Sequence, residues 1–353
     1  MTTEPVALRS HRLQKLNIYR KRMAMSGAIG PGIVLVVLFL IYVGVQPSVL
    51  SLLQFNNVAN EAAAVAIAAA GETLIVLVGG FDLSVGAVLS LINVLLATKI
   101  GTSIASQLLM VPIALGVGAG IGGVNGLLVN YLRIPSIVAT LAMSFFWSGV
   151  ALLILAQPGG AVPIEFVNWF TGNTGNAVPT AIIVLLVVTT LWLVFKRTPL
   201  GRAIYAVGGS AGAAEANGIR VRRTSMLAYT CGGLLYGLAG VLLTAQSASG
   251  DPNVGTPLLL SVFAAVVIGG TVFGGGRGDV VGSLIGAYIL YLIADVLFAI
   301  GVSSFYTNIL NGAVLLLAVL AGSLTGAKEW LLATIRQSPR ESEEDLGRTG
   351  MRI

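Results

Sequence analysis

The sequence predicts an all-α integral membrane protein with about ten transmembrane helices. Of its 353 residues, 56% are hydrophobic and only 10% are charged, whereas a soluble domain usually carries about 25% charged residues. The chain also contains 45 glycines, and small residues are frequent in membrane helices because they let neighbouring helices approach closely. Long apolar runs separated by short polar stretches complete the pattern.

Composition also excludes several classes of function. One cysteine, Cys231, and one histidine, His11, exclude a disulfide framework, a cysteine-based metal site and a Ser-His or Cys-His catalytic pair within one chain. The net charge of +6 comes from basic residues beside apolar runs rather than on one soluble face, so it does not indicate nucleic-acid binding. We therefore expect no catalytic residues, no bound cofactor and no metal site.

The chain divides into a basic arm over residues 1–26, a transmembrane domain over 27–325 and a polar tail over 326–353. The first apolar run lacks a clear cleavage site, so we expect an uncleaved span rather than a signal peptide. A connection over residues 50–60, at the membrane interface, is expected between the first two spans. The ten expected spans cover residues 28–45, 62–78, 83–97, 108–129, 137–156, 181–195, 226–245, 258–272, 280–300 and 306–324.

Basic residues predict the orientation of these spans. The loops expected on the cytoplasmic side contain Arg133, Arg277 and six bases between residues 196 and 223, whereas the outer loops contain only Lys99. Cytoplasmic loops carry an excess of Lys and Arg. An even number of spans then places both termini in the cytoplasm.

One stretch, residues 79–89, interrupts the apolar pattern with the sequence Gly-Gly-Phe-Asp-Leu-Ser-Val-Gly-Ala-Val-Leu. Two glycines weaken a helix, and Asp82 or Ser84 can cap the next one. A carboxylate at the centre of a membrane helix costs about 2.5 kcal/mol or more, so Asp82 is expected at a boundary or in a polar cavity. Two interpretations remain open: a turn at the membrane surface, or a broken helix that faces a solute path.

The segment 196–223 is the second informative stretch. It carries six basic residues against one acid, Glu215. Residues 211–216 favour a helix, and Asn217 followed by Gly218 is typical of a helix C-terminus. Such a helix either docks into a groove of another protein or only returns the chain to the membrane.

A weak internal repeat links two glycine-rich turns. Gly79-Gly80 and Val85-Gly86 recur as Gly275-Gly276 and Val281-Gly282, with each pair offset by 196 residues. A parallel repeat of this kind is one plan of transporters, and chance similarity between glycine-rich turns is the alternative.

Residues 79–86 resemble the Gly-Gly-Ile-Asp-Leu-Ser-Val-Gly signature of permease subunits of the ribose, xylose and galactose ABC importers. Two further blocks fit the same family in order. The resemblance covers residues 57–320, and departures are small: Phe81 stands where isoleucine is usual, and Glu72 where an apolar residue is common. The further blocks are Gly123-Val124-Asn125-Gly126 with Leu132-Arg133-Ile134-Pro135 and Thr140-Leu141, and Thr198-Pro199-Leu200-Gly201-Arg202 through Glu215-Ala216-Asn217-Gly218-Ile219.

This resemblance implies a type II ABC importer-like permease fold in the bacterial inner membrane. It also implies a homodimer with the solute path near its two-fold axis, an ABC ATPase subunit docked around Glu215, and a periplasmic sugar-binding protein. Membrane lipid is a further expected partner. For the solute path we expect Asp82, Ser84 and Asn125. For the ATPase-coupling loop we expect Gly201, Arg202, Gly208, Ala214, Glu215, Asn217, Gly218 and Ile219.

The chain itself has no phosphate-binding loop. Residues 274–279 are glycine-rich but lack the lysine and the following hydroxyl residue of that motif. We therefore expect ATP to be hydrolysed on a partner chain and this chain to be a transport subunit rather than an enzyme.

Asp82 is expected as a helix cap or interhelical partner more than as a direct sugar ligand.

Two alternatives to a sugar permease remain. In the first, the chain is an ABC permease whose solute is a branched-chain amino acid or a furanosyl signal molecule, and uptake assays with labelled solutes would separate these from a sugar. In the other, the chain is an ion-coupled secondary transporter in which Asp82, Glu72 or Asp295 carries a proton, and uptake needs a membrane potential but no ATP.

Overall fold

The computed structural model describes residues 28–175, 178–303 and the isolated positions 306, 309, 312, 313 and 316. Residues Met1–Leu315 form one compact unit and Leu316–Ile353 a second. The expected arm, the tail and most of the tenth expected span lie outside the described residues.

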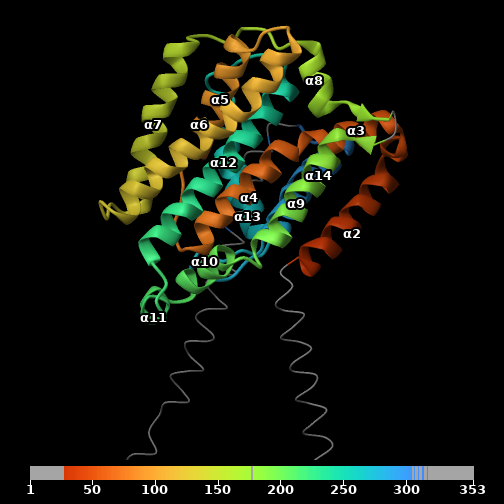
Figure 1. The fold of residues 1–353 in the computed structure, drawn as a ribbon. Helices are drawn as coiled ribbons and strands as arrows, with labels where there is room; N and C mark the ends of the chain where they lie inside the picture. Colours follow the sequence, from red (N-terminus) through yellow and green to blue (C-terminus); the bar gives the residue numbers. More distant parts are fainter. Residues whose placement is uncertain are drawn as a thin grey trace, which may run out of the picture. The chain divides into compact units, whose positions relative to one another are not determined.

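Each of the first nine expected spans coincides with a helix, which confirms the all-helical fold class. Figure 1 shows these helices side by side. The helices are α2 (Ile29–Val45), α4 (Ala63–Leu77), α5 (Val85–Lys99), α6 (Ile104–Asn130), α7 (Ser136–Ile154), α9 (Thr180–Phe195), α12 (Val221–Ser247), α13 (Leu258–Ile268) and α14 (Val280–Ala299).

Among the described residues, five helices are long and apolar enough to cross a membrane. Helix α9 joins them when it is taken together with α10 (Pro199–Gly209), from which it is bent by 78°. The five are Leu52–Leu77, Ile104–Asn130, Ser136–Ile154, Val221–Ser247 and Val280–Ala299. Three shorter apolar helices, α2, α5 and α13, accompany them.

Residues 50–60 differ from the expected interface connection. After a short 3-10 turn, η1 (Pro47–Leu50), the chain forms α3 (Leu52–Glu61), which continues into α4 as a single apolar stretch of 26 residues. Ser51 starts α3 by accepting a hydrogen bond from the Gln54 backbone N–H. The helix continues because no glycine or proline follows until α4 is well established.

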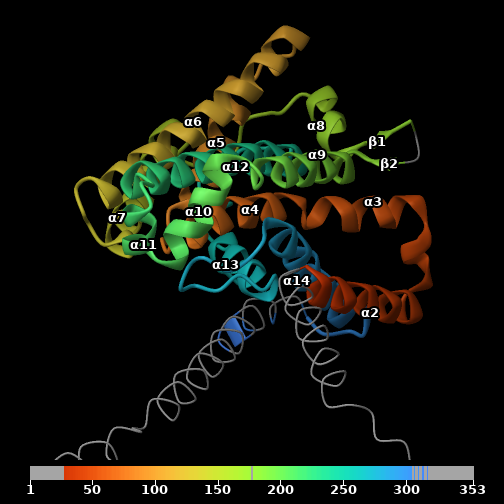
Figure 2. The same cartoon turned by 60° about the horizontal axis from the view of Figure 1, so that its bottom comes forward.

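The outer loop expected between the fifth and sixth spans also contains structure. It forms α8 (Ile164–Thr171) and a two-stranded antiparallel hairpin of β1 (Asn173–Thr174) and β2 (Val178–Pro179). Figure 2 shows this hairpin beside the start of α9.

Helix α4 lies at the centre of the core. All 15 of its residues are buried, and Figures 1 and 2 show it enclosed by other helices. A helix with apolar residues on every side is buried on every side, and the two polar residues of α4, Glu72 and Thr73, form hydrogen bonds within the core. The run of alanines and valines at its start has small side chains, so neighbouring helices pack against it closely.

Helices α6 and α12 meet backbone to backbone along a row of glycines. A Cβ added to Gly122 would lie 2.2 Å from the Tyr229 carbonyl oxygen, and one added to Gly233 would lie 2.2 Å from the Gly118 oxygen. Gly118 and Gly122 are four residues apart on α6, as Gly233 and Gly237 are on α12. This spacing places the glycines on one face of each helix, which permits the close approach.

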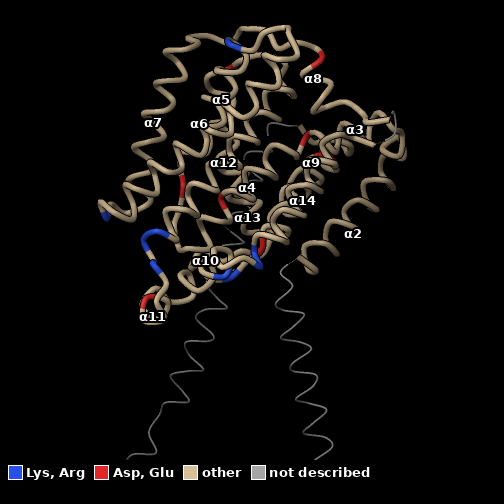
Figure 3. Tube along the Cα trace, viewed as in Figure 1, with Lys and Arg blue, Asp and Glu red and all other residues tan. Residues whose placement is uncertain are grey.

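The short helices α10 and α11 (Ala211–Ala216) lie at the end of the bundle where α4 ends and α14 begins, whereas α3 and α8 lie at the opposite end (Figure 1). Basic residues gather around α10 and α11, as Figure 3 shows for the described part of the chain. We call this end the coupling end.

Candidate functional site

The break between α4 and α5 requires glycine at two positions for different reasons. Gly79 has φ of +82°, in the left-handed region that favours glycine. Gly80 is limited by space, because a Cβ there would lie 2.4 Å from the Tyr229 hydroxyl oxygen. Helix α4 ends at Leu77 and α5 begins at Val85, so the expected break is confirmed.

Asp82 organises this break from a fully buried position. Its Oδ1 accepts hydrogen bonds from the Ser84 backbone N–H (2.9 Å) and from the Ser84 hydroxyl. Asn125 of α6 donates through Nδ2 to Asp82 Oδ2 (3.0 Å) and to Ser84 Oγ (2.8 Å). The three residues expected on the solute path therefore lie together in one buried cluster. Their role on that path stays a prediction.

Residues that were not predicted for the solute path also form hydrogen bonds in this region and connect it to α4, α7 and α12. Glu72 of α4 is fully buried and accepts from the Asp82 backbone N–H (3.1 Å) and from the Tyr236 hydroxyl of α12. Thr140 of α7 accepts from the Leu83 backbone N–H through Oγ1 (3.0 Å). We call Glu72, Asp82, Ser84, Asn125, Thr140 and Tyr236 the break cluster. It joins α4, α6, α7 and α12.

The hydrogen bonds of the break cluster connect four helices. Its two carboxylates receive their hydrogen bonds from hydroxyl, amide and backbone donors. A buried polar group is stable only when such partners are present. Within the described residues, no group of three or more His, Cys, Asp or Glu side chains can hold a metal ion.

Side-chain caps start both helices, α10 and α11, of residues 196–223, which we call the coupling segment. Thr198 accepts from the Gly201 backbone N–H (3.2 Å) at the start of α10, and Ser210 accepts from the Ala213 N–H (3.3 Å) at the start of α11. Helix α11 ends at Ala216 and is followed by Gly218 with φ of +80°. The helix expected over residues 211–216 and its Asn-Gly stop are thus confirmed.

The eight residues expected in the coupling loop fall into two groups. Gly201 and Ala214 are buried, and a Cβ on Gly201 would lie 2.3 Å from the Phe195 carbonyl oxygen. Gly208 and Ile219 are half-buried. The exposed group offers the surface available to another chain and consists of Arg202, Glu215, Asn217 and Gly218.

At Gly208, α10 contacts both the end of α4 and the turn before α14. A Cβ there would lie 1.7 Å from the Leu77 carbonyl oxygen and 2.4 Å from the Gly276 backbone nitrogen. The Gly276 N–H donates to that same Leu77 oxygen (2.9 Å), and Gly275 has φ of +81°. The end of α4 and the turn before α14 are therefore in direct contact with the coupling segment.

Asp279 forms a second connection, which the sequence analysis missed. Its Oδ1 accepts from Trp192 Nε1 (2.9 Å) and from the Val281 N–H (3.0 Å), which caps α14. Its Oδ2 forms an ion pair with Lys196 Nζ at 2.9 Å. An aspartate directly before an apolar run is a readable N-cap signal. The start of α14 is thereby attached to α9 and to the linker that leads into α10.

A comparison with protein families identifies the family to which the chain belongs. A family model described as "Branched-chain amino acid transport system / permease component" matches residues 54–319. The chain belongs to this permease family. The ribose import permease protein RbsC of Escherichia coli (strain K12) is 36% identical to the permease over 293 residues, which cover 82% of this chain and 91% of that protein.

Other relatives agree. RbsC of Bacillus subtilis (strain 168) is 36% identical over 314 residues, covering 87% of this chain and 97% of that protein. The probable ABC transporter permease protein YphD of Escherichia coli (strain K12) is 35% identical over 302 residues, covering 84% and 89%. No solved structure matches the permease significantly.

Family membership confirms the resemblance drawn from the motifs. The permease is a multi-pass protein of the inner membrane and a transport subunit rather than an enzyme. Membership implies partnership with a separate ATPase subunit and a periplasmic binding protein.

Proposed function

We propose that the permease forms the translocation path for a monosaccharide or related small polyol, which a periplasmic binding protein delivers. The observation that carries this proposal is the similarity to ribose import permeases, which extends at 36% identity over more than four fifths of the chain. ATP is bound and hydrolysed on the partner ATPase, and the permease itself needs no cofactor.

The coupling segment is the proposed docking surface for that ATPase. Glu215 of α11 is exposed, as are Asn217 and Gly218 directly after the helix, and Arg202 is exposed on α10. A movement of α10 reaches α4 through Gly208, because no side chain separates their backbones. It reaches α14 through Asp279, which α9 and its linker hold. Closure of the ATPase on ATP would thus shift helices on both sides of the core.

Orientation, oligomeric state and lipid contact belong to the same proposal. The basic residues at the coupling end support a cytoplasmic position for α10 and α11, and with it cytoplasmic termini. Large apolar side chains exposed on α2, α7 and α9 support contact with lipid, for example Leu40, Phe145 and Leu191. A second copy of the permease completes the path, as the motif resemblance implies.

The test begins with purification of the tagged permease in mild detergent and identification of co-purifying chains. We expect a stoichiometric ATPase subunit. In vesicles that contain the complex and its binding protein, Glu215→Arg should leave the permease inserted but abolish ATP-dependent uptake, because it reverses the one acidic charge of the exposed helix. Glu165→Arg, on α8 at the opposite end, is the matched control. Wild-type uptake in Glu215→Arg would refute the docking role.

The family description supports one second candidate, a branched-chain amino acid as solute. Competition of labelled ribose and labelled leucine for uptake separates the two. Uptake of leucine but of no sugar would overturn the monosaccharide assignment while leaving the permease assignment intact.

A further inference from the structure

A cavity of about 550 Å³ opens between α2, α3, α13 and α14. Its wall includes Gln54, Asn57 and Glu61 from α3, and Tyr291 and Asp295 from α14. A volume of this order accommodates a small solute, since ligand sites commonly measure about 300 to 1,000 Å³. The cavity is separate from the break cluster, with which it shares no residue.

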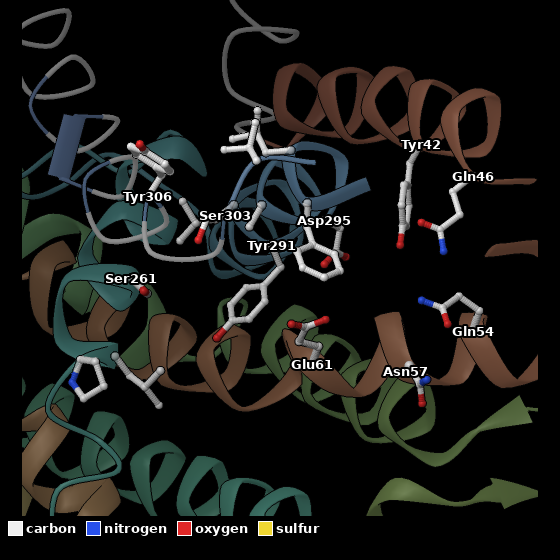
Figure 4. A pocket seen from close by; sticks show the side chains of 17 residues that line it. Tyr42, Gln46, Gln54, Asn57, Glu61, Ser261, Tyr291, Asp295, Ser303 and Tyr306 are labelled. Atoms are coloured by element: carbon white, nitrogen blue, oxygen red, sulfur yellow. The ribbon is translucent and has the colours of Figure 1, made fainter. Parts of the chain in front are cut away.

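Two carboxylates extend into this cavity from opposite walls. Figure 4 shows Glu61 on α3 and Asp295 on α14 directed toward the same space, with Tyr291 beside them. Among the described residues, neither carboxylate forms an ion pair or a hydrogen bond with another side chain or with the backbone. Their oxygens are thus acceptors without a donor inside the protein. Glu61 is exposed and Asp295 is half-buried, so both carboxylates are open to a ligand or water that supplies the donor.

The cavity lies at the end of the molecule opposite the coupling segment. Helix α14 begins at Val280, next to the ion pair of Asp279 with Lys196. Asp295 follows fifteen residues later, which corresponds to about 22 Å along a helix. With the coupling end in the cytoplasm, this position is in the outer part of the membrane domain, where a delivered solute enters.

We propose that this cavity is a binding site for a neutral polyhydroxylated solute, with Glu61 and Asp295 accepting hydrogen bonds from its hydroxyl groups. Carboxylates accept at several lone-pair positions, and the amides of Gln54 and Asn57 both donate and accept. The ring of Tyr291 offers an apolar face to the C–H side of a sugar ring. This mixture of acceptors, amides and an aromatic ring matches a molecule that carries a hydroxyl group on most carbons.

The same lining argues against solutes that carry a negative charge. No Lys or Arg is present among the residues that line the cavity in the described part of the chain. The carboxylate of an amino acid or a phosphate group would therefore meet two negative side chains and no cation, which is repulsive at close range. The inference rests on the proposed function and makes it more specific, because it disfavours an amino acid as the solute.

Protection of a single cysteine tests the site directly. Ala294→Cys places a thiol in the cavity wall, in a chain whose native cysteine is removed by Cys231→Ala, with the permease and its ATPase subunit reconstituted in lipid nanodiscs. Labelling with a maleimide is followed with and without D-ribose, D-xylose or D-galactose at saturating millimolar concentration. We expect at least one sugar to slow labelling about fivefold, as high occupancy requires. Thr102→Cys, exposed in the loop before α6, is the control and should label at the same rate throughout.

Substitutions in the wall identify the groups responsible. Asp295→Leu removes the acceptor and should weaken protection by about tenfold or more, the usual effect of losing a hydrogen bond to a charged group. Asp295→Asn retains one acceptor and should weaken protection less. Glu165→Gln, an exposed acid on α8 outside the cavity, should leave the protection unchanged.

The outcomes separate this inference from the proposed function. Protection by L-leucine or by putrescine, without protection by any sugar, would overturn the site as a polyol site, and so would the absence of protection by every solute. If the same preparation retains a bound ATPase that hydrolyses ATP, only the inference falls. If no ATPase accompanies the permease and vesicles take up no sugar, the proposed function falls as well.

Discussion

Replacing Gly208 with alanine tests whether direct contact between α10 and the two helix breaks carries the motion of the ATPase. The added Cβ would lie 1.7 Å from the Leu77 carbonyl oxygen and 2.4 Å from the Gly276 nitrogen. Both obstacles are backbone atoms, so no side-chain rotation can relieve them. An ordinary van der Waals contact requires a separation of about 3.4 Å or more, so α10 must withdraw by about 1.7 Å.

This withdrawal has a calculable effect on stability. Overpacking of a well-packed site typically costs about 1 to 3 kcal/mol. The higher helix propensity of alanine offsets at most about 1 kcal/mol of this cost, because glycine is that much less favourable within a helix. We therefore expect a net loss of about 1 to 2 kcal/mol, seen as a fall of a few degrees in the melting temperature.

Two assays on the purified complex separate stability from coupling. Thermal unfolding in detergent reports the first, and the ratio of sugar molecules imported to ATP molecules hydrolysed reports the second. We expect Gly208→Ala to keep its ATPase subunit but to lower this ratio about tenfold, because the contact surface no longer reaches the end of α4. The neighbouring Gly209→Ala is the control, since its Cβ would meet no atom within 4 Å.

A normal import ratio in Gly208→Ala, together with the expected fall in melting temperature, would refute the coupling argument. Equal behaviour of Gly208→Ala and Gly209→Ala in both assays would refute the packing argument as well.

Two further predictions concern the connections on either side of this contact. Asn125→Leu removes the amide donor that serves Asp82 and Ser84, so the permease should lose about 2 to 4 kcal/mol of stability; an unchanged melting temperature would contradict the buried network. Lys196→Met breaks the ion pair with Asp279, whose side chains are 31% and 15% exposed, and after allowance for solvent screening the loss should be only about 0.5 to 1 kcal/mol. High salt should lower the melting temperature of the wild-type protein toward that of Lys196→Met, because salt screens the ion pair. A melting temperature that does not depend on salt would argue against an electrostatic contribution.

Most of the helices could be predicted because each depends on properties that are local in the sequence. A run of apolar residues long enough to span a bilayer predicts a helix, and the Asn217-Gly218 pair predicts where α11 stops. The expectation failed at residues 50–60 because polar residues interrupt the apolar run there without breaking the helix. Polarity indicates where a membrane boundary is expected, whereas glycine and proline indicate where a helix ends.

The hydrogen bonds of the break cluster could not be predicted in the same way. Asp82 and Asn125 are 43 residues apart, and Glu72 and Tyr236 are 164 residues apart. Which of these side chains meet depends on which helices pack together, and almost every helix here has the same apolar composition on all sides. Family resemblance indicated Asp82, Ser84 and Asn125 together, but as residues of the solute path and not as hydrogen-bond partners of one another.

The glycine row between α6 and α12 limits how an alternating cycle can proceed. Two helices whose backbones touch cannot slide or rotate against each other without a collision of carbonyl oxygens with Cα atoms. We therefore expect α6 and α12 to move as one unit, and the break cluster attaches α4 and α7 to it, so a movement that reaches α4 from α10 would carry the whole unit. Among the described residues, a single side-chain hydrogen bond, from Thr73 to Ser283, connects α14 to this unit. Helix α14 carries Asp295 near one end and is joined to Lys196 of the coupling segment at the other, so movement between α14 and the unit would link the coupling end to the cavity.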